Sequence, residues 1–143
     1  MPSPILAQNY DVSQPWLTQP FLVQRSFTAS GDVTLVPGRV MGVILATGAL
    51  AIQAAANTDG SEMPRFLNYE NITVANGNTV QLWVSEKGEF AEDAVVLTSP
   101  DTLNTPVRTV TTGGGTIRDL LAANTQIILR TRTQNSGYDN AIA

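Results

Sequence analysis

Cysteine and histidine are absent from this 143-residue chain, and lysine occurs once, at Lys87. Without cysteine the chain forms neither disulfides nor thiolate metal sites. Without histidine it has no imidazole base and no charge switch near neutral pH. These absences remove the side chains on which most enzyme mechanisms depend. We therefore expect a binding or structural protein rather than an enzyme. We assign it no catalytic, cofactor-binding or metal-ligating residues.

Positive charge is scarce and does not cluster. The chain has 8 Lys and Arg residues against 12 Asp and Glu residues, which gives a formal net charge of −4 and a pI near 4.5. A nucleic-acid-binding surface has to neutralise phosphates with clustered basic side chains. We therefore expect no direct contact with nucleic acid.

Long apolar runs are also missing. The longest, residues 40–56, is interrupted by Gly42, Thr47, Gly48 and Gln53 and makes a poor membrane span. The N-terminus has no basic region followed by an apolar block, so it does not resemble a signal peptide. We expect no membrane contact, and a protein that stays in the cytoplasm of the cell that makes it.

The residues present predict one globular domain, because 43% are hydrophobic and only 14% are charged. Short runs of β-branched and large apolar residues, separated by Pro37-Gly38, Gly48 and other turn residues, predict a mainly β fold with small α elements. Between Thr73 and Val84, the dipeptide Asn76-Gly77 predicts the type I′ turn of a hairpin.

The clearest helix is expected after Thr116. Asp119 stands three residues later, in a capping-box arrangement, and apolar residues follow at helical spacing. Asn124 is the expected end of this helix. Alternating apolar residues then predict a strand over residues 126–133.

The first thirty residues differ from the rest. Four prolines, including Pro15 and Pro20, exclude a regular helix, yet apolar residues are too frequent for a neutral linker. Two interpretations remain open: the segment lies across the core of its own domain, or it is an extended arm that docks onto a partner. For the arm, the expected binding residues are Tyr10, Pro15, Trp16, Leu17, Pro20, Phe21 and Leu22.

Two local patterns suggest chemistry but lack its other requirements. The carboxylates Glu86, Glu89, Glu92 and Asp93 lie close in sequence, but the ligand spacing of a calcium loop is absent, so we expect a solvated surface. Residues 113–116 supply glycines before the predicted helix, as in a phosphate-binding turn. No lysine follows them, so the P-loop pattern is not met.

Several segments, in order, resemble the head decoration protein family of tailed phages, the lambda gpD-like family. GDVTLVPGRVMGV (residues 31–43) is similar to the opening strand pair of that family, and DGSE (residues 59–62) to its "DGS" loop. GEFAEDAV (residues 88–95) resembles its "GxFNEDAL" segment, and residues 117–130 resemble its closing helix and strand. The family's usual lysine after "VLG" is Val43 here, and residues 100–115 form a longer stretch than usual.

The resemblance implies a compact single-domain decoration fold with an extended N-terminal arm. The division it suggests is an arm over residues 1–30, a β-rich domain over 31–133 and a polar tail over 134–143. It further implies a structural, non-enzymatic protein that binds the major capsid protein as a homotrimer at threefold positions of the expanded phage head. Its place would be the outer surface of the virion, after assembly in the host cytoplasm.

The alternatives from other classes are a small β-barrel carrier or ligand-binding module, and a component of a phage tail or baseplate. A carrier would present a modified lysine at an exposed hairpin tip. Lys87 is flanked by Glu86 and Gly88 rather than by the residues such carriers use.

Overall fold

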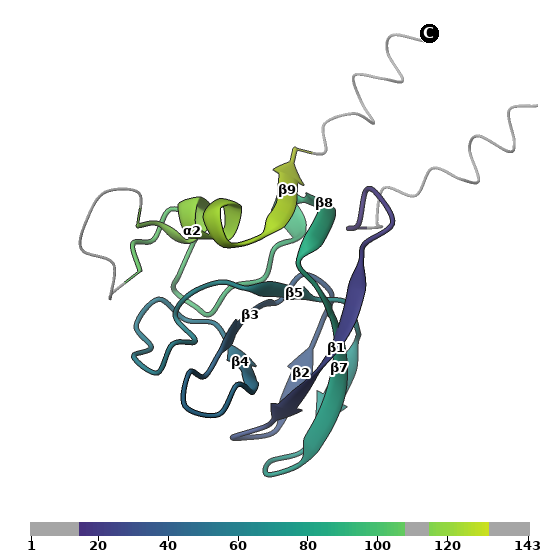
Figure 1. Ribbon diagram of the computed structural model, residues 1–143, viewed down its shortest axis with the longest axis vertical. Helices are drawn as coiled ribbons and strands as arrows, with labels where there is room; N and C mark the ends of the chain where they lie inside the picture. Colours follow the sequence, from purple (N-terminus) through teal and green to yellow (C-terminus); the bar gives the residue numbers. More distant parts are fainter. Residues whose placement is uncertain (1–14, 108–114, 132–143) are drawn as a thin grey trace, which may run out of the picture.

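The computed structural model describes residues 15–107 and 115–131 (Figure 1). Short strands dominate them, which confirms the expected mainly β fold with small α elements in one compact domain. The strands are β1 (Leu22–Thr28), β2 (Val33–Leu35), β3 (Val40–Val43), β4 (Leu50–Ile52), β5 (Phe66–Asn68), β6 (Ile72–Val74), β7 (Thr79–Ser85), β8 (Lys87–Ala91) and β9 (Gln126–Arg130). The helical elements are the short 3-10 helix η1 (Glu92–Ala94) and the α-helix α2 (Ile117–Asn124).

A closed barrel with strand order β1-β4-β3-β5-β7 forms the main body. Its longest ladder joins β1 to β7 in antiparallel register, from Leu22 opposite Ser85 to Thr28 opposite Thr79. Figure 1 shows these two strands side by side. A single parallel pair, Phe27 with Leu50, closes the barrel between β1 and β4. The first strand of the described residues therefore completes the barrel.

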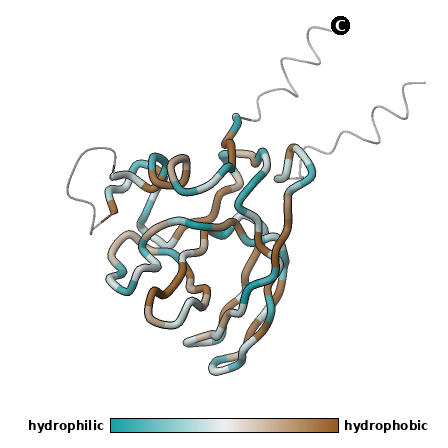
Figure 2. Tube along the Cα trace, viewed as in Figure 1, coloured by the Kyte–Doolittle hydropathy of each residue, from teal (hydrophilic) through white to brown (hydrophobic). Residues whose placement is uncertain are grey.

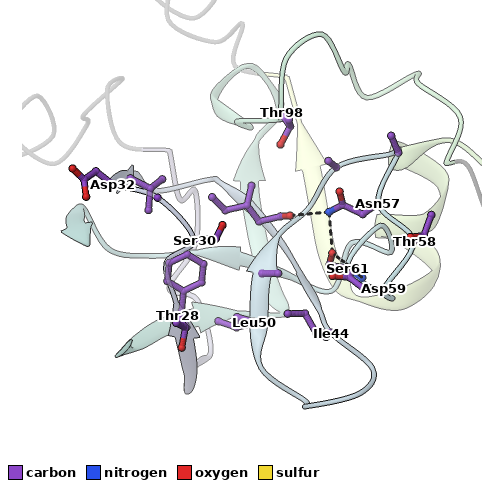
Figure 3. A pocket seen from close by; sticks show the side chains of 17 residues that line it. Thr28, Ser30, Asp32, Ile44, Leu50, Asn57, Thr58, Asp59, Ser61 and Thr98 are labelled. Carbon is purple, nitrogen blue, oxygen red and sulfur yellow. Dashed lines mark hydrogen bonds between the residues drawn. The ribbon is translucent and has the colours of Figure 1, made fainter. Parts of the chain in front are cut away.

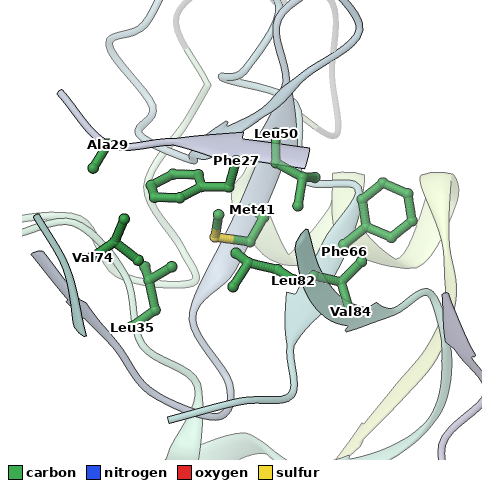
Figure 4. Close-up of a cluster of buried hydrophobic side chains, with 9 residues drawn as sticks. All are labelled: Phe27, Ala29, Leu35, Met41, Leu50, Phe66, Val74, Leu82 and Val84. Carbon is green, nitrogen blue, oxygen red and sulfur yellow. The ribbon is translucent and has the colours of Figure 1, made fainter. Parts of the chain in front are cut away.

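The barrel interior holds the main hydrophobic core (Figure 4). Alternation along each strand directs every second side chain inward, and hydrophobic residues recur along the strands in Figure 2. The buried members are Phe27, Ala29, Leu35, Met41, Leu50, Phe66, Val74, Leu82 and Val84. Burying each large side chain contributes roughly 1.5–3 kcal/mol, so this cluster is the chief source of the domain's stability.

Two small sheets accompany the barrel. β2 pairs with β6, and β8 pairs in parallel with β9. The β8–β9 sheet covers part of the barrel's outer surface and forms a second core there, made of Trp16, Val40, Leu67, Phe90 and Ile127.

Helix α2 begins and ends where the sequence predicts. The hydroxyl of Thr116 accepts a hydrogen bond from the amide of Asp119 at 3.2 Å, which caps the first turn. The helix ends at Asn124, and its buried residues Ile117 and Leu121 face the body. The strand expected after it is present as β9, which ends at Arg130.

The turn at Asn76-Gly77 differs from the expectation. Gly77 has φ +84°, but no residue other than glycine has positive φ in the described part of the chain, so the turn is not type I′, which needs positive φ at both central positions. The strands on either side do not pair with each other: β6 pairs with β2, and β7 pairs with β1 and β5. The expected hairpin is therefore wrong, because both strands find longer-range neighbours.

The proposed boundary of the N-terminal arm at residue 30 also needs correction. Residues 22–28 are the barrel strand β1, so Leu22 belongs to the body and not to an arm. Prolines end before this stretch, at Pro20, and leave β1 free to donate its backbone hydrogen bonds. Of the predicted site residues, Tyr10 lies outside the described residues.

Candidate partner-binding surface

Residues 15–21 lie along β8, on the edge opposite β9. The amide of Ala91 donates to the carbonyl of Pro15 at 2.8 Å, and the amide of Leu17 donates to the carbonyl of Glu89 at 2.8 Å. Farther along, the amide of Phe21 donates to the carbonyl of Lys87 at 3.2 Å. The segment between Pro15 and β1 is thus fixed to the body by its backbone.

Trp16 is buried within this arrangement, with only 7% of its surface exposed. Its ring packs edge to face against Phe90, with centroids 4.8 Å apart and planes at 75°. A Cβ added at Gly88 would come within 3.0 Å of the Trp16 ring, which shows how closely the backbone of β8 approaches the indole. The prediction that Trp16 anchors the chain on a partner is therefore wrong. Of the two open interpretations, packing across the protein's own core holds for this residue.

Phe21 behaves in the opposite way. It is 63% exposed. Ile128 of β9, the strand on the other side of β8, is 50% exposed. Both side chains line a shallow hollow of about 300 Å³ together with Thr18, Lys87 and Gln126. We call these five residues the Phe21 surface.

A second hollow adjoins the Phe21 surface. It has a volume of about 380 Å³ and lies between Phe21, Lys87 and the end of α2 at Ala123 and Asn124. Leu17, two-fifths exposed, lies on the same N-terminal segment. Exposed apolar side chains beside a concave surface are typical of sites where a protein partner binds.

Two ion pairs lie on the β8–α2–β9 side of the body. Arg130 donates to Glu89 at 2.6 Å, and Arg118 binds Glu92 through both guanidinium nitrogens at 2.8 and 2.9 Å. The hydrogen bonds from Arg118 hold the pKa of the Glu92 carboxyl below its usual value. Two of the four carboxylates in the acidic cluster, Glu89 and Glu92, are therefore in ion pairs. Within residues 15–107 and 115–131, no three potential ligands gather into a metal site.

A groove of about 770 Å³ lies at another part of the barrel and is shown in Figure 3. Its two carboxylates already have partners. Asp32 accepts from the amide of Asn76 at 2.8 Å, and Asp59 accepts from the hydroxyl and the amide of Ser61. These Ser61 bonds lower the pKa of Asp59. No basic residue lines the groove among the residues that the structure describes.

The position of Lys87 does not suit a carrier protein. It is the first residue of β8. Its carbonyl accepts a hydrogen bond from the amide of Phe21, and Lys87 lies opposite Gln126 of β9. It is therefore within a sheet and not at a hairpin tip. Of the predicted glycine turn, residues 113 and 114 lie outside the described residues. No helix in the described segments is long and apolar enough to cross a membrane.

Sequence reasoning named Phe21 as an expected binding residue but did not name the residues that surround it in the Phe21 surface. Ile128, Lys87 and Gln126 come together with Phe21 only because β8 and β9 pair in parallel. The alternation of residues 126–130 did indicate that Ile128 faces away from Ile127. Nothing in the sequence indicated which segment it would meet.

No protein-family model matches the chain, and no curated protein matches it.

Proposed function

We propose that this chain is a head decoration protein of a tailed phage, a structural protein without enzymatic activity. It binds the major capsid protein through the Phe21 surface and the residues that precede Pro15. The observation that carries the proposal is the exposed pair Phe21 and Ile128, placed beside the point where the N-terminal segment joins β8. The ordered resemblance of residues 31–130 to the decoration family supplies the identity of the partner.

In this proposal the N-terminal segment supplies main-chain contacts to the partner, and the body supplies the Phe21 surface. An extended segment adds to a strand edge of a partner by main-chain hydrogen bonds, which give affinity with little demand on sequence. Ordering such a segment costs entropy, so a single attachment binds modestly. Three attachments on one homotrimer raise the effective concentration of each other and bind tightly together.

In this function the trimer occupies threefold positions on the outer surface of the virion and joins neighbouring capsid subunits against internal pressure. A net charge of −4 suits a protein that has no contact with the packaged nucleic acid. The alternatives, a carrier module or a tail or baseplate component, predict no binding to heads.

The test is competition for undecorated, expanded heads of the source particle. Phe21→Ser should weaken binding at least about thirtyfold, because truncating an aromatic contact at the centre of an interface costs about 2 kcal/mol or more. Leu45→Ser is the matched control, since Leu45 is 78% exposed but lies on the loop between β3 and β4. It should bind as wild type does.

Removal of residues 1–14 should also abolish binding. If wild type fails to bind heads, the proposed function is wrong. If wild type binds and Phe21→Ser binds equally well, the partner contacts another surface.

A further inference from the structure

The outer face of the β1–β7 ladder divides into a covered part and a bare part. Ser85 lies opposite both Leu22 of β1 and Leu67 of β5, and Ser85 and Leu67 are fully buried beneath the β8–β9 layer. Residues on one face recur at every second position along a strand. The next residue of β7 on this face is therefore Trp83, which is 41% exposed. We call Trp83 and the residues beside it on the neighbouring strands one row of the face.

Trp83 has a neighbour on each side. Gln24 of β1 lies directly opposite it. On the other side the amide of Tyr69 donates to the carbonyl of Trp83 at 3.0 Å, so the register of β5 and β7 continues by one residue and places Tyr69 beside Trp83. Tyr69 is as exposed as Trp83. The row therefore presents two aromatic rings.

Beyond this row the same face carries only hydroxyl and amide side chains. Ser26 lies opposite Gln81, and Thr28 lies opposite Thr79 with their hydroxyls 2.7 Å apart. We call the whole area the Trp83 face, which consists of Gln24, Ser26, Thr28, Tyr69, Thr79, Gln81 and Trp83.

No member of the Trp83 face is charged. The carboxylate of Glu70 lies at its edge, where it accepts a hydrogen bond from the amide of Trp83 at 2.8 Å. Arg25 belongs to the opposite side of the ladder, where its guanidinium stacks over Phe66 with 5.2 Å to the ring centroid. An uncharged face with two exposed aromatic rings matches the composition of protein interface centres, where charge is depleted and aromatic residues are enriched.

We propose that the Trp83 face is the contact between copies of this chain. Two copies of a protein with net charge −4 repel each other, so they associate best through a surface that carries no charge. Glutamine, serine and threonine side chains both donate and accept hydrogen bonds, so the face is chemically complementary to a second copy of itself. A nucleic acid would need cations, and a lipid surface would need more apolar area.

Contact between the same face on two copies gives a twofold dimer, whereas a threefold trimer joins two different surfaces. This dimer contact is therefore separate from the proposed homotrimer and does not require a capsid. The face is small compared with the roughly 20–30 residues per side of a stable interface. We therefore expect weak association in free solution that depends on concentration.

Sedimentation equilibrium of the full chain up to about 1 mM tests this expectation. Wild type should form oligomers, and Trp83→Ser should raise the dissociation constant at least about thirtyfold. Gln81→Glu is a second variant that keeps both aromatic rings and adds a negative charge to the exposed face. It should weaken association at least about tenfold, because like charges then meet across the contact. Phe21→Ser is the matched aromatic control, and its association should equal that of wild type.

Fluorine NMR of protein labelled with 5-fluorotryptophan gives an independent readout. Of the two tryptophans, only Trp83 should change its resonance with concentration, because Trp16 is buried within the domain. The Trp83→Phe variant assigns the two resonances.

A wild type that stays monomeric throughout this range overturns the inference, as do folded Trp83→Ser and Gln81→Glu variants that associate normally. Loss of head binding by Trp83→Ser with unchanged association would assign the face to the capsid and would also overturn it. If wild type associates through this face but does not bind heads, the inference stands and the proposed function fails.

Discussion

The indole ring of Trp16 meets the phenyl ring of Phe90 edge to face, with ring centroids 4.8 Å apart. The contact joins the N-terminal segment to the strand β8, which lies far along the chain. Through this contact Trp16, in a proline-rich segment with two open interpretations, becomes part of the domain's own second core. The indole nitrogen of Trp16 has no hydrogen-bond partner among the described residues, so the contribution of this side chain there is apolar packing.

Trp16→Ala should destabilise the body by about 3–5 kcal/mol, because it removes a buried aromatic side chain and leaves a cavity beside Phe90. Chemical denaturation followed by circular dichroism measures the change. Leu17→Ala, at the neighbouring exposed position, should cost less than about 1 kcal/mol. Equal stabilities of Trp16→Ala and wild type would contradict the buried position of Trp16.

Gly38→Ala should cost about 2 kcal/mol or more. Gly38 has φ +94°, a left-handed conformation that costs other residues about 1–2 kcal/mol. An added Cβ would also lie 2.5 Å from the Phe90 ring and 2.6 Å from the carbonyl oxygen of Ala94. Gly31→Ala is the control, since nothing lies within 4 Å of its added Cβ and its φ is not positive. If both variants unfold at the same denaturant concentration, this account of Gly38 is wrong.

The stability contributed by the Glu92–Arg118 pair should depend on pH. Because the folded-state pKa of Glu92 is lowered, this contribution is fully present above the usual pKa of 4.5 and is lost as the pH falls through the lowered value. The pair is partly exposed, so we expect it to contribute no more than about 1 kcal/mol.

Thermal unfolding of wild type and Glu92→Gln at several pH values measures this contribution. The difference between the two should be present at neutral pH and should vanish in strong acid. Some acid sensitivity should remain in Glu92→Gln, because Ser61 lowers the pKa of Asp59 in the same way. A difference that grows as the pH falls would refute this assignment.

Two truncations should separate the N-terminal segment from the body. Removal of residues 1–14 should leave the unfolding transition nearly unchanged, because the described core begins at Trp16. Removal of residues 1–25 should unfold the domain, since it deletes Trp16 and more than half of β1. Calorimetry of both proteins is the measurement. A cooperative transition near the wild-type temperature in the shorter protein would restore the original arm boundary.

Local features were predictable from the sequence wherever neighbouring residues decide them. The cap formed by Thr116 and Asp119 and the helix end at Asn124 depend on a few adjacent residues. The strands on either side of Pro37-Gly38 were also recognisable, since turn residues bound runs of β-branched side chains. Residues 49–56, which contain β4, were ambiguous between a strand and a short helix.

Pairing and burial depend on distant residues and were not predictable in this way. The strand that contains Thr73 pairs with β2, although a turn joins it directly to β7. The same amphipathic composition at Trp16 and Phe21 suits a docking arm or a core segment. In the folded domain the Trp16 ring packs against Phe90, whereas the Phe21 ring is exposed.

The closing position of β1 has a consequence for the kinetics of folding. Thr28 and its partner Thr79 are separated by 51 residues, and the other pairs of this ladder lie farther apart still. Among the described strands β1 is synthesised first, and it cannot pair with β7 until most of the barrel has been synthesised. Pairings so distant in sequence slow folding, because the entropy of the intervening loop is lost before the contacts form. Registration of β1 against β7 is consequently the step expected to limit the rate at which the barrel closes.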